Sequence, residues 1–134
     1  MSMRLEPSMS PDTAFFWEGL RNHRLLIQRC TGCQALRHPP RPMCPACRSL
    51  SWDTIEASGR GTVHSFVIPR HPVLPFMDDP TVVVLVDLEE GPRLVSNLRG
   101  VDPADVVVDM PVEVLYEAFD GDLVLHQFRP ATGP

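Results

Sequence analysis

The chain has 134 residues, and its 17 acidic side chains outnumber its 12 basic ones, all arginine, for a formal net charge of −5 at pH 7. This length suits one domain or two very small ones and excludes a large multidomain enzyme. Residues 61–134 hold four Arg against twelve acids, a net of −8, which argues against a nucleic-acid backbone as a partner of that half. The chain has no run of 18 apolar residues, so no membrane-spanning helix is expected.

A short helix is the first element that the sequence predicts. Asp12 or Thr13 can cap it, and residues 14–20 continue it, with Gly19 keeping it short. Aromatic residues on a short helix are more often core than surface. The cysteine-containing segment that follows the helix is too small to cover all of these aromatic side chains. We therefore expect part of this aromatic stripe to face a partner protein. The predicted interface residues are Phe15, Phe16, Trp17 and Leu20.

The four cysteines form two Cys-x-x-Cys pairs separated by ten residues, namely Cys30, Cys33, Cys44 and Cys47. Each pair can form a tight turn that directs two thiolates at one point, and two such turns make a closed tetrahedral site. Because the protein then supplies all four ligands, the pattern predicts a structural Zn²⁺ and not a reaction centre. With all thiols bound to metal, no cysteine nucleophile remains.

Two other interpretations of the cysteines have to be weighed. A disulfide within each pair would close a very short ring and stabilise little. Residues 1–14 show no apolar secretory segment, so a reducing cytoplasm is expected, and there the spacing favours metal. An iron redox carrier is the second alternative, but rubredoxin-type turns usually carry Gly after the second Cys, where this chain has Gln34 and Arg48.

The rest of the chain is predicted to be mostly β. Residues 25–29 and 51–56 are expected to be the strands that flank the cysteines, and three prolines within 37–42 favour an extended connection. A turn is expected at residues 58–61 and one helical turn at 103–105. Five further strands are predicted at residues 62–68, 81–88, 93–98, 112–117 and 123–128. Five short strands suit a small barrel of the oligonucleotide/oligosaccharide-binding (OB) type.

Several motifs together resemble one family. They are Phe16-Trp17-Glu18-Gly19-Leu20, Gln28-Arg29-Cys30-x-x-Cys33, Pro39-Pro40-Arg41-Pro42-x-Cys44-Pro45-x-Cys47, Ser58 to Val63, Gly91 to Leu98, and Phe128-Arg129-Pro130. Over residues 14–130 the chain resembles the zinc-ribbon/OB-fold proteins associated with acyl-CoA metabolism. The resemblance implies a tail and helical segment (1–28), a rubredoxin-like zinc ribbon (29–57) and a five-stranded OB-fold barrel (58–134). At position 38 most relatives have an aromatic residue, and this chain has His38.

The resemblance also implies a function. Family members look like non-catalytic accessory subunits of thiolase-like enzymes and of lipid-transfer-protein-like steroid side-chain aldolases. By resemblance, the helix and ribbon bind the partner and the barrel helps hold acyl-CoA. Arg37 and Arg41 flank the proline segment, and the proline-rich loop 69–80 carries further candidates for ligand binding. These loop residues are Arg70, His71 and Phe76.

No independent enzyme activity is expected. His64, His71 and His126 invite acid–base chemistry, but no Ser, Cys or acid near them in the sequence completes a nucleophile–base pair. The alternative function is a single-stranded nucleic-acid-binding zinc-ribbon/OB protein, because both modules recur in such proteins. That function needs a basic, aromatic-lined barrel face, and the net charge of −8 disfavours it.

Overall fold

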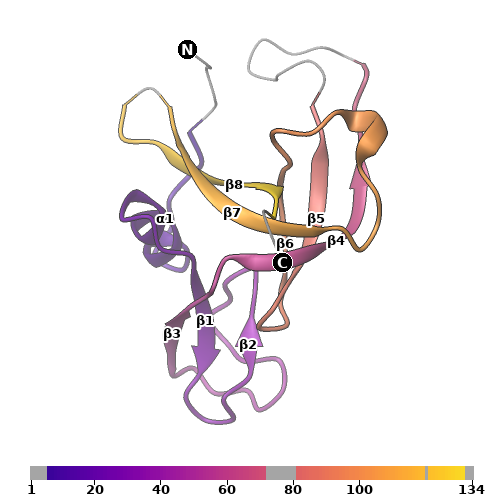
Figure 1. The fold of residues 1–134 in the computed structure, drawn as a ribbon. Coiled ribbons are helices and arrows are strands. Elements are labelled where there is room, and N and C mark those ends of the chain that lie inside the picture. Colours follow the sequence, from indigo (N-terminus) through magenta and orange to yellow (C-terminus); the bar gives the residue numbers. More distant parts are fainter. Residues whose placement is uncertain (1–5, 72–80, 120, 132–134) are drawn as a thin grey trace.

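The computed structural model describes residues 6–71, 81–119 and 121–131 (Figure 1). Its helix is α1 (Ala14–Arg21), and a 3₁₀ turn spans Pro103–Asp105. The strands are β1 (Leu26–Cys30), β2 (Leu36–Arg37), β3 (Trp52–Glu56), β4 (Arg60–Val67), β5 (Val83–Leu88), β6 (Arg93–Asn97), β7 (Pro111–Ala118) and β8 (Val124–Pro130). No helix in the described part of the chain is long and apolar enough to cross a membrane. The predicted mostly β fold with one short helix near the N-terminus is confirmed.

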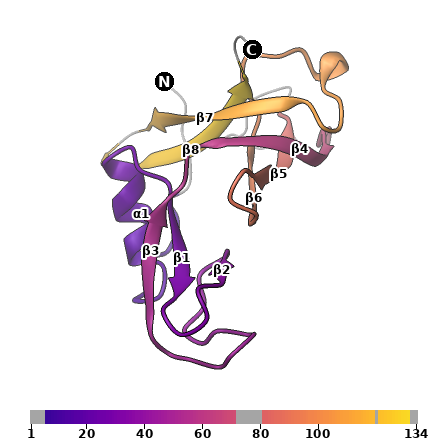
Figure 2. The same cartoon turned by 60° about the horizontal axis from the view of Figure 1, so that its bottom comes forward.

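The ribbon is a three-stranded antiparallel sheet in the order β2-β1-β3, and Figure 2 shows it extending away from the other sheet. Gln28 of β1 lies opposite Arg37 of β2 and opposite Thr54 of β3. The ranges predicted from the sequence agree with β1 and β3 to within one residue, but β2 was not predicted and lies at the start of the expected extended connection. Two residues are too few for a pattern of alternating side chains, so only pairing with β1 defines this strand.

The second sheet has five antiparallel strands in the order β6-β5-β4-β7-β8 and is curled into an OB-like barrel. An irregularity between Val63 and Ser65 increases the bend of β4. The edge strands β6 and β8 meet through a parallel bridge between Leu98 and Phe128. Side chains continue this contact, since Ser96 Oγ donates to the carbonyl of His126 at 2.8 Å. The barrel is therefore closed partly by backbone pairing and partly by side-chain hydrogen bonds.

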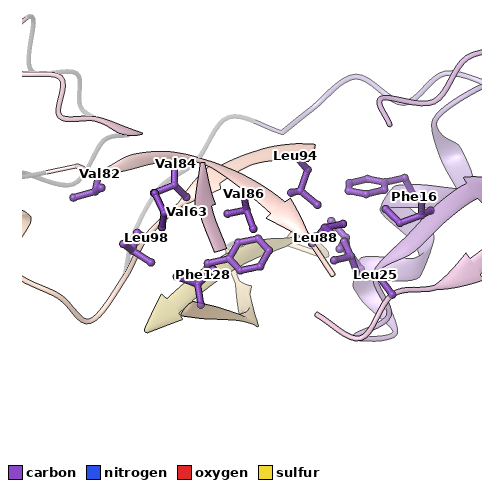
Figure 3. Packing of buried hydrophobic residues seen from close by; sticks show 14 of the residues in the cluster. Phe16, Leu25, Val63, Val82, Val84, Val86, Leu88, Leu94, Leu98 and Phe128 are labelled. Carbon is purple, nitrogen blue, oxygen red and sulfur yellow. The ribbon is translucent and has the colours of Figure 1, made fainter. Parts of the chain in front are cut away.

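A single hydrophobic core runs from the barrel to the helix, as Figure 3 shows. Along β5 the side chains alternate, so that Val84, Val86 and Leu88 are buried. At one end of the cluster Leu94 of β6 lies beside Phe16 of α1 (Figure 3). Because helix and barrel share this core, α1 holds a fixed position against β1 and β8.

The helix begins where the sequence predicts, but not for the predicted reason. Thr13 occupies the N-cap position, yet its hydroxyl makes no capping bond and instead accepts from the backbone N–H of Ser10 at 3.1 Å. Gly19 is required by packing, because a Cβ at that position would lie 2.9 Å from the backbone oxygen of Arg24. The helix is thus stabilised mainly by burial of its apolar face.

Candidate functional site

The four cysteine side chains converge on one point of the ribbon. Their Sγ atoms all lie within 4.8 Å of one another, with Cys30 and Cys47 3.4 Å apart and Cys33 and Cys44 3.6 Å apart. A tetrahedral Zn–S₄ site with bonds of ~2.3 Å has S···S edges of about 3.8 Å, whereas a disulfide measures about 2.05 Å. The geometry fits a metal ion bound by four thiolates, and all four cysteines are free thiols.

Two tight turns position these thiols. After the first pair, the N–H of Gln34 donates to the carbonyl of Cys30 at 2.9 Å, and after the second pair Arg48 does the same to Cys44 at 2.9 Å. Both residues have positive φ angles, 67° for Gln34 and 66° for Arg48. Glycine is the residue best suited to that conformation. The two turns therefore keep the rubredoxin-like geometry although neither has the usual glycine.

The environment of Cys30 and Cys44 favours the thiolate form, which is the form that binds metal. The backbone N–H of Cys33, and after it the partner thiol of Cys47 and the N–H of Gly32, lower the pKa of Cys30 to about 6. Backbone N–H groups of Cys47 and Ala46 likewise lower the pKa of Cys44. At Cys47 the backbone N–H of Ser49 lowers the pKa, but hydrogen bonds with the three other thiols and burial outweigh it and raise the pKa to about 11. The buried positions of Cys30 and Cys44 place two of the four ligands inside the ribbon.

Arg37, predicted as a ligand-binding residue, is buried beneath the proline segment and is 8% exposed. Its Nε donates to Gln28 Oε1 at 2.9 Å, and its Nη2 donates to the carbonyl of Arg41 at 2.8 Å. Gln28 Oε1 also accepts from the backbone N–H of Arg41 at 2.8 Å. In this conformation Arg37 therefore secures the connection between the two cysteine pairs. The side chain of Arg41 is exposed.

The remaining ligand candidates lie at or beyond the edge of the described residues. Arg70 and His71 are exposed and follow β4. Phe76 lies outside the described residues. The role predicted for these three stays a prediction.

The aromatic stripe on α1 is mostly core. Phe16 is 3% exposed and Leu20 is fully buried, so in this conformation neither offers its side chain to a partner. Phe15 and Trp17 are half-buried, and the ring of Phe15 lies 5.0 Å from that of Trp52 on β3. The interface prediction stays a prediction, and Phe15 and Trp17 are the two of its four residues that have exposed surface in this conformation.

Phe16 is instead the centre of an aromatic cluster that the sequence did not indicate. Its ring centroid lies 5.2 Å from that of Trp17, 5.2 Å from His38 and 5.4 Å from His126. Burial, and secondarily the neighbouring His126, lowers the pKa of His38 to about 4. Burial also lowers the pKa of His126. Both rings are thus uncharged at neutral pH, and His38 packs against Phe16 as an aromatic side chain.

The cluster joins residues far apart in the chain, which is why sequence reasoning missed it. Phe16 belongs to α1, His38 follows β2, and His126 lies on β8. A motif search detects residues at short spacing, whereas these three are brought together only when helix, ribbon and barrel pack. One sequence signal did point to this cluster: the family resemblance implies an aromatic residue at position 38, directly before the Pro-Pro pair.

A zinc ribbon with four cysteine ligands, followed by an OB-like barrel, defines the class of protein to which this chain belongs. Residues 17–53 match the family described as "ChsH2, rubredoxin-like zinc ribbon domain", and residues 54–117 match "ChsH2, C-terminal OB-fold domain". The chain belongs to this ChsH2/DUF35 family of zinc-ribbon/OB-fold proteins. The family resemblance, the fold class and the zinc cofactor expected from the sequence are confirmed.

Two relatives illustrate the range of the family. The chain is 46% identical over 130 residues to a "probable enoyl-CoA hydratase alpha subunit" of Thermomonospora curvata, which covers 97% of this chain but 41% of that protein. It is 35% identical over 123 residues to a "DUF35 domain-containing scaffold protein" of Pyrococcus furiosus, covering 86% of this chain and 90% of that one. The chain thus spans about two fifths of the hydratase subunit's length.

A solved structure matches the whole fold. A chain of the "Ltp2-ChsH2(DUF35) aldolase" superposes with a TM-score of 0.92 at 46% identity, covering 95% of this chain and 100% of that chain. The names of these relatives are those of hydratase or aldolase components and of scaffold proteins. They support an accessory subunit of acyl-CoA enzymes.

Proposed function

We propose that this protein is a non-catalytic accessory subunit that binds a lipid-transfer-protein-like enzyme of the thiolase fold and helps to hold its acyl-CoA substrate. The observation that supports this most is the similarity to the aldolase component, which extends over 100% of that chain with a TM-score of 0.92. A unit that matches over its full length can make the same kind of contacts as its relative.

The chemistry of the described residues supports an accessory role. The four thiols are arranged as metal ligands, and a metal held by four protein ligands has no position left for substrate. Nδ1 of His64 bonds to Asp87 at 3.1 Å, and Asp87 also binds Arg93, so this histidine belongs to a surface ion-pair group. Nε2 of His126 bonds to the carbonyl of Val95 at 3.1 Å. These hydrogen bonds orient the two rings without activating a nucleophile.

In this role the parts of the chain have different tasks. The helix and the ribbon (residues 29–57) form the surface that binds the partner, with Phe15 and Trp17 as its half-buried aromatic residues. The barrel (residues 58–134) lies near the CoA entrance of the partner. Exposed arginines suit phosphate groups, and Arg41 and Arg70 are the candidates.

Co-expression with a lipid-transfer-protein-like enzyme from the same host tests the proposal. The two chains should co-purify as one complex, and acyl-CoA cleavage should require both. Arg41→Gln with Arg70→Gln should raise KM for the CoA ester several-fold, whereas Arg48→Gln, which changes another exposed arginine of the ribbon, should not. Turnover of acyl-CoA by the purified chain alone would refute the accessory role.

A further inference from the structure

The four cysteines of the ribbon differ in their exposure, and the difference alternates along the chain. Cys30 and Cys44, the first of each pair, are buried, whereas Cys33 and Cys47, the second of each pair, are exposed. All four lie at the end of the ribbon that points away from the barrel (Figure 2). A small molecule in solution therefore reaches one cysteine of each pair without a change of conformation.

Two close contacts between thiols join one pair to the other. Sγ of the exposed Cys47 lies 3.4 Å from Sγ of the buried Cys30. Sγ of the exposed Cys33 lies 3.6 Å from Sγ of the buried Cys44. Because a disulfide bond measures about 2.05 Å, each contact has to shorten by about 1.5 Å to become one. Each accessible sulfur thus has a buried sulfur of the other pair within reach.

The charges of the cysteine segment also suit reactive sulfur. Residues 31–52 contain three arginines and no acidic residue, and Arg48 directly follows the exposed Cys47. An electropositive, partly exposed environment is typical of cysteines that react with oxidants. The four sulfurs are thiolates when they bind Zn²⁺, and this ion has no redox chemistry of its own. Electrons given to an oxidant at this site therefore come from sulfur.

We propose that the ribbon is a site of oxidation by hydroperoxides, at which two disulfides between the pairs replace the metal and preserve the fold. The Cys47 thiolate attacks the O–O bond of H₂O₂, which gives a sulfenic acid and a hydroxide. The Cys30 thiolate then attacks that sulfur, the S–O bond breaks, and a second hydroxide leaves as the disulfide forms. Two protons from solvent turn the hydroxides into water. Cys33 and Cys44 react likewise with a second H₂O₂, and Zn²⁺ is released.

The disulfide pattern decides whether the ribbon keeps its structure. Bridges between the pairs link residues 17 and 11 positions apart, so they tie the two cysteine turns together as the metal does. Bridges within the pairs would leave the turns unlinked. The backbone N–H of Thr31 donates to the carbonyl of Ser51 at 3.2 Å, which joins the first turn to the chain beyond the second. Exchange of this amide therefore reports the link. The inference is independent of the proposed accessory role.

Trypsin distinguishes the two patterns, because cleavage after Arg29, Arg37 and Arg48 separates the pairs into peptides 30–37 and 38–48. The zinc-loaded full chain is treated with H₂O₂, remaining thiols are blocked with N-ethylmaleimide, and the chain is denatured and digested without reductant. We expect the two peptides to stay joined, and tandem mass spectrometry to assign the two bridges to the contacts described above. A colorimetric zinc chelator should record one ion released for every two disulfides formed.

Amide exchange then tests whether the fold is preserved. After oxidation, the N–H of Thr31 should exchange within about fivefold of its rate in the zinc-loaded chain. When 1,10-phenanthroline removes zinc in the presence of a phosphine reductant, this amide should exchange at least about 100-fold faster. Met43→Leu is the matched control, because Met43 is 48% exposed and precedes Cys44, so it is another sulfur that peroxide reaches. The variant should release zinc and form disulfides as the unmodified chain does.

Separate peptides that each carry an internal disulfide would overturn the proposed bridges. Sulfinic or sulfonic acids in place of disulfides would overturn the reaction, and intact zinc at peroxide concentrations that oxidise Met43 would overturn the site. An oxidised chain in which Thr31 exchanges as fast as in the zinc-free, reduced chain would overturn preservation of the fold. Because no partner enzyme or CoA ester is present, failure here is distinguishable from failure of the accessory role.

Discussion

The ribbon and the barrel are both built from antiparallel strands but are held together by different interactions. Around the cysteines most side chains between residues 31 and 51 are exposed, and Cys30 and Cys44 are the buried ones close to the metal site. The barrel instead buries a continuous set of apolar side chains, among them Val63, Leu94 and Phe128. The cysteine end of the ribbon therefore depends on metal, whereas the barrel depends on its hydrophobic core.

The junction between the ribbon and the barrel is held by packing, ring stacking and backbone hydrogen bonds. Helix α1 extends the barrel core through Phe16, and the ring of His23 stacks on Tyr116 of β7 at 5.0 Å. The backbone of Ala57 also bonds to the carbonyl of Leu25 at 2.8 Å. A metal-dependent part is thus held in a defined position when a shared core fixes its base.

Removing the metal should have the largest effect and should separate the two parts. Cys44→Ser is expected to abolish zinc binding and hydrogen-exchange protection around the two cysteine turns (residues 30–48), because structural zinc contributes on the order of 10 kcal/mol to small domains. Protection in β4–β8 should remain, as measured by amide exchange and metal analysis. Ala46→Ser, in the same turn, is the control. Simultaneous loss of the barrel would show that the two parts fold as one unit.

A large-to-small substitution in the barrel core should destabilise the barrel and leave the zinc site intact. Phe128 is fully buried, so Phe128→Ala is expected to lower the free energy of unfolding of the barrel by about 3–5 kcal/mol. Zinc content should stay at one ion per chain. Leu50→Ala, at a ribbon residue that is 66% exposed, should change stability by less than about 0.5 kcal/mol. Denaturant titration followed by circular dichroism measures both, and zinc loss in the Phe128 variant would contradict the prediction.

The junction should respond to pH through His38. Its pKa is about 4 in the folded chain, against about 6.5 when unfolded, so the folded state binds the proton less readily. Stability is fully present above about pH 6.5 and is lost as the pH falls towards 4, with a loss of about 2 kcal/mol between pH 7.5 and pH 5.

His38→Phe should remove this part of the pH dependence while keeping the contact with Phe16. Denaturation of wild type and variant at both pH values measures the difference, and zinc release affects both chains alike. An unchanged difference between the two pH values in the variant would contradict the assignment to His38.

The smallest effect concerns the backbone of the cysteine turns. Arg48 has a φ of 66°, where a side chain is strained, so Arg48→Gly should stabilise the zinc-loaded ribbon by about 0.5 kcal/mol after the entropy cost of glycine. Arg48→Ala keeps the Cβ and should give no gain. Thermal unfolding of the zinc-loaded proteins compares the two, and equal stability of both variants would argue against strain.

The sequence predicted well wherever the signal was local. The two cysteine pairs indicated the metal site, and alternating or β-branched runs such as residues 81–88 indicated the barrel strands. Predictions from residue type alone, those for the ligand and interface residues, stay predictions, and the structure adds only where these side chains lie. Arg37 was interpreted as a ligand for phosphate, but its guanidinium is bound to Gln28 and Arg41. Phe16 and Leu20 were interpreted as interface, but the barrel buries them.

The amino-acid order alone determined the zinc ribbon, the strand count of the barrel and the family, because spacing and periodicity are properties of neighbouring residues. Packing decided the rest. The aromatic cluster of Phe16, His38 and His126, and the cavity that these residues line, exist only because three separate elements meet over one core. Contacts between residues so distant in sequence leave no periodic trace, since their proximity results from the total burial of apolar surface and not from any local pattern.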